Sequence, residues 1–153
     1  MIYTLALLIG VVAGLRAMMA PAAISFAAHC GLLDLAGSWL AFLGYRFTPW
    51  IAGIAALGEL VTDQLPSTPS RKMPVPFGIR IVMGGLCGAA ITIPAGLWIG
   101  GLAAGVIGAV IGTLGGARAR AGLAKAFAHD RPAAVIEDIV AIALAIGIVS
   151  ALR

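Results

Sequence analysis

Two carboxylates, Glu59 and Asp63, stand four residues apart at the end of an apolar stretch, in the sequence GELVTDQLPSTPSRKMP. Residues four apart lie on the same face of a helix. Four further ionisable residues also fall within or at the edge of apolar stretches: Arg16, Arg80, Glu137 and Asp138. A charge that faces lipid alone costs roughly 2.5 to 3.5 kcal/mol on insertion scales. We therefore expect these six side chains to pair, to face water or to stay protonated around a common polar site.

The sequence does not decide whether such a site would bind a cation or an anion. Two arginines against four carboxylates leave an excess of negative charge, which would attract a cation or hold a proton on Glu59, the deepest acid. Alternatively, the arginines face an anionic substrate and the acids only hold them. A structural interpretation also exists, because Asp63 near a helix C-terminus and Arg80 near an N-terminus both oppose their local helix dipoles. A bridge between the two would relieve both and fix the register of a helical hairpin.

The composition places these charges inside a membrane protein. The chain has 153 residues, of which 61% are hydrophobic and 10% charged, and its mean hydropathy is +1.08. A soluble domain is nearer half apolar and a quarter charged. The net charge of +4 comes from loops and helix ends, and no stacking motif accompanies it, so we expect no nucleic-acid partner. Membrane lipids are the expected surroundings.

No motif for catalysis or for a metal or cofactor is present. The chain contains no HExxH, no GxSxG and no cluster of His and Cys. Cys30 and Cys87 are isolated thiols, which we interpret as small apolar packing residues. The sequence therefore predicts neither an enzyme nor a metal or cofactor site.

Apolar stretches of about 20 residues are long enough to cross a bilayer. We predict an all-α, polytopic transmembrane helix bundle that forms one domain, 1–153, with a first helix interrupted by Gly14, Arg16 and Pro21. Its five predicted spans are 2–28, 48–65, 77–93, 96–116 and 133–152. The aromatic segment 31–47 is too short to span and is interpreted as an interfacial helix, because Trp and Tyr prefer the headgroup level.

Glycine ladders indicate how these spans pack. Small residues four apart let helix backbones approach closely in lipid. The ladder residues are Gly84, Gly88, Gly108, Gly112 and Gly116. We expect them to pack helices together and to support a homo-oligomer.

The basic residues predict an orientation. Six of them lie in the loop 66–76 and in the stretch that follows the fourth span, so the positive-inside rule makes these two loops cytoplasmic. With five spans the N-terminus is then cytoplasmic and the C-terminus outside, a prediction that fails if the first span is a re-entrant pair of half-helices. The stretches 9–29 and 107–129 also resemble each other, which predicts an inverted repeat with a site at the repeat interface.

Three motifs extend over nearly the whole chain: GLRAMMAPAAISFAA near the start, GELVTDQLPSTPSR, and AVIEDIVAI near the end. Through them the chain resembles domain-of-unknown-function family 4126, small bacterial integral membrane proteins. The resemblance implies an all-helical protein of the bacterial inner membrane and brings no activity with it. The matching residues are Gly14, Arg16, Glu59, Asp63, Pro66, Pro69, Arg71, Arg80, Glu137 and Asp138. Gln64 departs from the pattern, which has a lysine there.

Together these features predict an inner-membrane protein that transports or conducts a small ion or polar solute. The charged cluster would form its site, with Glu59 and Asp63 as principal ligands. Two other classes stay open. One is a non-transporting scaffold whose charges only lock helices together, and the other is a protein that interacts with lipids.

Overall fold

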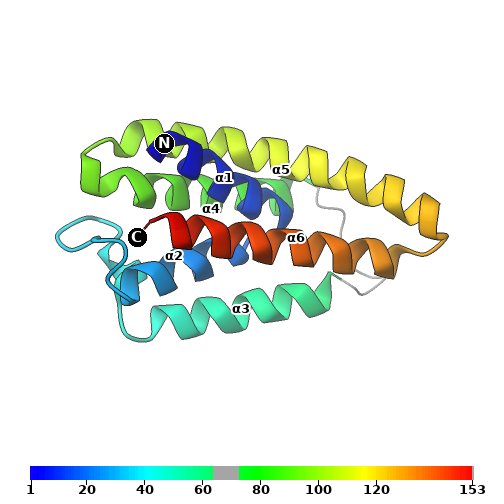
Figure 1. Ribbon diagram of the computed structural model, residues 1–153, viewed down its shortest axis with the longest axis horizontal. Coiled ribbons are helices and arrows are strands. Elements are labelled where there is room, and N and C mark those ends of the chain that lie inside the picture. Colours follow the sequence, from blue (N-terminus) through cyan, green and yellow to red (C-terminus); the bar gives the residue numbers. More distant parts are fainter. Residues whose placement is uncertain (64–72, 153) are drawn as a thin grey trace.

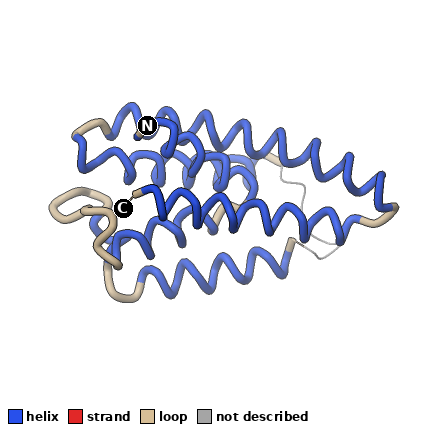
Figure 2. Tube along the Cα trace, viewed as in Figure 1, coloured by secondary structure: helices blue, strands red, loops and turns tan. Residues whose placement is uncertain are grey.

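The computed structural model describes residues 1–63 and 73–152, and every regular element among them is a helix (Figures 1 and 2). The predicted residues Gln64, Pro66, Pro69, Arg71 and Lys72 lie outside this described part. The elements in chain order are α1 Ile2–Leu15, α2 Met19–His29, η1 Ala41–Gly44, α3 Thr48–Thr62, α4 Pro74–Thr92, η2 Ile93–Ala95, α5 Trp98–Phe127 and α6 Asp130–Ala151. The all-helical class predicted from the sequence is therefore confirmed.

Three helices are long and apolar enough to cross a membrane: α4 with η2 (Pro74–Ala95), α5 and α6. The apolar helices α1 and α3 are shorter, with 14 and 15 residues. At a rise of about 1.5 Å per residue, α3 is about 22 Å long. The fourth predicted span ended at residue 116, but α5 continues as one helix to Phe127. The tips of α5 and α6 consequently reach beyond the end of α3 (Figure 1).

The predicted first span, 2–28, is interrupted as expected, and its second helix does not continue in the direction of the first. Helix α1 runs parallel to α5, because Gly10 lies against Gly105 and Gly14 against Thr113. Helix α2 runs antiparallel to α3, since Met18 contacts Glu59 while Phe26 stacks on Trp50. Since α3 and α5 both start at the end of the bundle that holds the chain termini, the chain turns back between α1 and α2 (Figure 1). The two half-helices form a helical hairpin that turns back within the bundle.

The turn between α1 and α2 also bears on the predicted inverted repeat and on where the two chain termini lie. The stretches 9–29 and 107–129 were expected to run in opposite directions. Their first parts instead lie side by side and parallel in α1 and α5, and the second stretch lacks the break of the first. Both chain ends lie at the same end of the bundle (Figure 1), whereas a five-span chain would have separated them.

The core of the bundle is the three-helix contact of α1, α4 and α5. Gly108 faces the carbonyl oxygen of Leu7, and Gly112 faces that of Val11, so a Cβ atom at either position would collide with backbone. Gly84 and Gly88 meet Gly105 and Gly101 of α5 in the same way, and Gly116 is also buried. The predicted packing glycines therefore bring helices of one chain together, as close backbone approach in lipid requires.

The segment 31–47 is not the predicted interfacial helix. It consists of turns and the short helix η1, because Gly31 and Gly37 adopt positive φ and Asp34 binds the backbone N–H of Ala36. Four of its leucines are buried against the bundle: Leu33, Leu35, Leu40 and Leu43. Its aromatic side chains remain exposed at the end where both termini lie. Among them, Trp39 makes an edge contact with Trp98 at the start of α5.

Candidate functional site

The interruption between α1 and α2 is the starting point of the site. Pro21 has no N–H to offer the carbonyl of Ala17, and its ring would clash with that carbonyl in a continuous helix. The helix ends one turn earlier, where Arg16 adopts an extended backbone conformation with φ −140° and ψ 109°. Backbone groups that a continuous helix would pair are thereby left open inside the bundle, where each must find another partner.

Glu59 of α3 takes the place of the missing acceptors. Its two carboxylate oxygens accept hydrogen bonds from the backbone N–H groups of Ala17, at 2.7 Å, and Met18, at 2.8 Å. In an uninterrupted helix these groups would bond to carbonyls four residues earlier. The carboxylate also lies at the N-terminus of α2, where the helix dipole favours negative charge. Glu59 therefore caps the second half-helix from a neighbouring element.

Arg80 of α4 supplies the complementary donors. Its Nη1 donates to the carbonyl oxygens of Gly14, at 2.8 Å, and Leu15, at 2.6 Å, which are the acceptors left open at the C-terminus of α1. Its Nη2 lies 3.4 Å from the Glu59 carboxylate. The hydroxyl of Thr113 on α5 donates to the same Gly14 carbonyl at 3.2 Å. The two ends of the break are thus held by an acid and a base that also pair with each other.

Arg16 lies in the break itself and has no exposed surface. Its guanidinium forms ion pairs with Asp63 at the end of α3 and with Asp138 of α6, and its Nε donates to Asp138 at 2.6 Å. The predicted Asp63–Arg80 bridge exists at 3.8 Å, but Arg16 is the nearer described partner of Asp63. The planar guanidinium, with five N–H donors, suits a cation that must join two carboxylates.

Arg120 is a member of the cluster that the sequence prediction missed. It lies on α5, donates to the Asp130 carboxylate through Nε at 3.0 Å and to the Asp63 carbonyl at 3.2 Å, and lies 3.7 Å from Glu137. In the sequence, Arg120 lies after the fourth predicted span, among the six basic residues expected to set the orientation. The sequence does contain an indication that the helix extends this far, because no proline between residues 116 and 127 interrupts it. Arg120 adds a third guanidinium to the site, but it brings the Asp130 carboxylate with it, so the expected excess of negative charge is unchanged.

The six predicted residues and Arg120 therefore meet at one place, which we call the ionic cluster. Every long helix contributes to it, as does the break between α1 and α2. Two grooves among the described residues are apolar, and none of the charged residues lines either of them. The described residues contain no set of three His, Cys, Asp or Glu side chains arranged to hold a metal ion. The chemistry available at the cluster is therefore ion pairing and proton or ion exchange among carboxylates and guanidiniums.

The fold and the cluster together define a class: an all-helical protein with three helices able to cross a membrane and an ionic centre at a broken helix. Comparisons of the chain with protein-family models, with curated proteins and with solved structures find no match. The resemblance to family 4126 accordingly rests on the three sequence motifs.

Proposed function

We propose that this is a multi-pass protein of the bacterial inner membrane that moves a small ion or polar solute through the ionic cluster. The observation that supports this most is the helical hairpin of α1 and α2, whose inner ends both terminate at the cluster. Transporters build their sites at the inner ends of broken helices, because free backbone groups and helix dipoles are available there. Glu59 and Asp63 are the proposed principal ligands, with the arginines as their counter-ions.

The number of charges favours this function over a purely structural role. A buried ion pair is often no better for stability than well-packed apolar residues of the same volume. The cluster holds Arg16, Arg80, Glu137 and Asp138 at 8% exposure or less. Ionisable side chains at membrane depth typically mark a pathway for ions or protons. A purely structural role, in which charges only hold two helices together, would need a single buried ion pair.

In the proposed topology, α4, α5 and α6 cross the bilayer, α3 runs inward from the outer face to the ionic cluster, and α1 and α2 enter and leave on that same outer face. Arg118, Lys125 and Arg131 are exposed at the tip formed by α5 and α6, so the positive-inside rule makes this tip cytoplasmic. Both termini then lie on the outer face. This reverses the N-terminal orientation expected from five spans, because the chain turns back at Arg16. A homo-oligomer would need a surface other than the glycine ladders, which are filled within one chain.

The test is ion flux in proteoliposomes with Glu59→Gln. Gradients of H⁺, Na⁺, K⁺ and Cl⁻ are applied in turn, with ion-sensitive dyes inside the vesicles. The substitution keeps one acceptor for the N–H groups of Ala17 and Met18 but removes the charge, so we expect a strong loss of the flux that the unmodified protein supports. Asp34→Asn is the matched control, because Asp34 is an exposed carboxylate in the segment 31–47. Undiminished flux in Glu59→Gln would remove Glu59 from the mechanism.

The second candidate is a non-transporting scaffold. One observation favours it: Glu59 and Arg80 already satisfy the backbone groups that a substrate would otherwise bind. A scaffold predicts that the unmodified protein carries none of the four ions faster than protein-free vesicles. It also predicts that Glu59→Gln acts only on the midpoint of thermal unfolding.

A further inference from the structure

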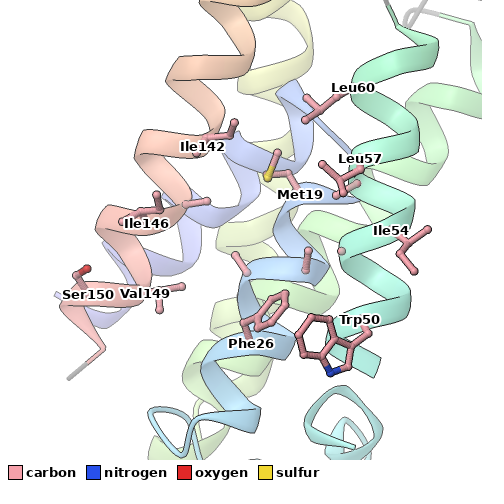
Figure 3. Close-up of a pocket in the computed structure, with 15 residues that line it drawn as sticks. Met19, Phe26, Trp50, Ile54, Leu57, Leu60, Ile142, Ile146, Val149 and Ser150 are labelled. Carbon is pink, nitrogen blue, oxygen red and sulfur yellow. The ribbon is translucent and has the colours of Figure 1, made fainter. Parts of the chain in front are cut away.

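A long apolar groove lies between α3 and α6, with α2 as its floor (Figure 3). Its volume is about 550 Å³, within the range of sites that hold small molecules. One end lies at Trp50 and Ser150, the other at Leu60 and Ile142 (Figure 3). The groove exists because α3 packs on α2 and on the segment 31–47, and leaves its other side open toward α6.

The rims and the floor of this groove differ in kind. The rims carry long apolar side chains that are largely exposed, including Ile54 at 71%, Leu57 at 64% and Ile146 at 62%. They continue without interruption into the apolar outer faces of α3 and α6. On the floor, the small residues Ala22 and Ala23 of α2 lie between the larger Met19 and Phe26. In a bilayer such a groove opens directly onto hydrocarbon, and leaving it empty would forfeit the dispersion contacts of its walls.

We propose that this groove binds one acyl chain of a membrane phospholipid from the outer leaflet. The proposal rests on the membrane placement given above for the proposed function, but not on transport. From Trp50 to Leu60 the groove follows α3 for ten residues, or about 15 Å at 1.5 Å per residue. That length is half of a hydrocarbon core of about 30 Å, which is the depth of a single leaflet.

The residues at the ends fit a lipid in this direction. Trp50 lies beside the start of α3, at the end of the bundle that holds the termini, where an indole ring sits well at the headgroup level. Ser150 brings a hydroxyl to the same end (Figure 3). The opposite end is formed by Leu60 and Met19, which follow in sequence Glu59 of the ionic cluster and Met18, whose backbone N–H binds Glu59. The bound chain would thus separate the cluster from the bilayer.

A helix of a second copy fits the groove less well. Helices associate in lipid through small residues that let backbones approach, and here the small residues lie on the floor behind long side chains. A transmembrane helix would also extend about 20 residues, twice the length of the groove. A flexible acyl chain can enter between the rims and follow the floor.

The test is photo-crosslinking in proteoliposomes that contain a phosphatidylcholine with a diazirine on its acyl chain. Mass spectrometry of the peptides locates the label. We expect severalfold more label on Met19 and Leu60 than on Ile107 and Ile111, which are exposed apolar residues of α5 outside the groove. Equal labelling of the two surfaces would overturn the proposal.

Groove-filling variants sharpen the result. Ala23→Phe and, as an exposed alternative on the rim, Leu57→Trp should lower the groove label severalfold without changing the label on α5. Ala103→Phe is the matched control, because Ala103 is exposed on α5 and lines neither groove. Disulfide-linked dimers of Leu57→Cys in a Cys30→Ala background would identify a second copy as the occupant and overturn the lipid assignment.

The labelling experiment tests the lipid site, and the flux experiment separately tests transport. Groove labelling without any ion flux would leave the lipid site standing and remove the transport proposal. Flux without preferential labelling would leave the transport proposal standing and remove the lipid site.

Discussion

At the scale of single residues, the ionic cluster replaces hydrogen bonds that the backbone lacks. The break at Arg16 leaves donors at Ala17 and Met18 and acceptors at Gly14 and Leu15, and Glu59 and Arg80 satisfy them as a complementary pair. An unpaired backbone group in hydrocarbon costs several kcal/mol. The charges therefore have a structural role at the break whether or not the protein carries an ion or solute, and a loss of flux must be compared with a loss of stability.

Arg16→Gln should lower the free energy of unfolding by about 3 to 5 kcal/mol, because it removes the buried guanidinium that joins the carboxylates of Asp63 and Asp138. Arg16→Lys should recover only part of this loss, since a single ammonium lacks the planar donors that reach both acids. Unfolding of the detergent-solubilised protein by heat or by increasing SDS measures both variants. Arg46→Gln is the control, because Arg46 is exposed and lies over the Phe47 ring. An unfolding midpoint for Arg16→Gln equal to that of the control would contradict the assignment.

At the scale of helices, the contact between α1 and α5 holds the first half of the broken helix in place. Helix α1 has only 14 residues, yet it lies along α5 from Tyr3, against Gly100, to Gly14, against Thr113. Glycine is required where a Cβ would strike backbone, and it weakens a helix elsewhere by about 0.5 to 1 kcal/mol relative to alanine. The glycines of α5 therefore divide into two groups with opposite expected effects.

Gly108→Ala should destabilise the protein by about 1 to 3 kcal/mol, because the new Cβ would collide with the Leu7 carbonyl and force α1 away. Gly115→Ala on the same helix should stabilise it by about 0.5 to 1 kcal/mol, since nothing lies within 4 Å of the added Cβ. SDS titration of the two variants beside the unmodified protein measures whether each substitution lowers or raises the stability. Equal shifts for the two would mean that α1 does not lie against Gly108.

The sequence was sufficient for the helical class, for most of the ionic cluster and for the place of the break. The cost of charge in lipid selects Arg16, Glu59, Asp63 and Arg80 without any structure, and Pro21 marks the interruption. The direction of α2 was not predictable, because a run of apolar residues has the same hydropathy whether the chain continues through the bilayer or turns back. Arg120 was missed for a related reason: Gly115 and Gly116 resemble a helix end, but the Ala-, Arg-, Leu- and Lys-rich residues that follow are strong helix formers, and α5 continues eleven residues beyond Gly116.

At the scale of the molecule, the apolar residues are distributed as in a protein whose outer surface meets lipid. Large apolar side chains such as Ile51, Ile99 and Ile139 are each more than 60% exposed, whereas Arg16 has no exposed surface. A soluble protein buries such side chains and exposes its charges. Three exposed basic side chains, Arg118, Lys125 and Arg131, lie at the tip of α5 and α6, whereas Arg46 is exposed at the end that holds the termini, so this surface also predicts an orientation.

That orientation is tested by a single cysteine in an N-terminal tag, in a Cys30→Ala background. The buried Cys87 should stay unreactive toward a membrane-impermeant maleimide. If the basic tip is cytoplasmic and α1 and α2 return to the face they enter from, the tag cysteine should react in intact cells. A cysteine at position 129, beside Arg131 at the tip, should react only after the membrane is permeabilised. Five full crossings would instead shield the tag cysteine in intact cells, because the tag and the basic tip would then share the cytoplasmic side. The accessibility of the N-terminus thus separates a re-entrant pair from a continuous first span.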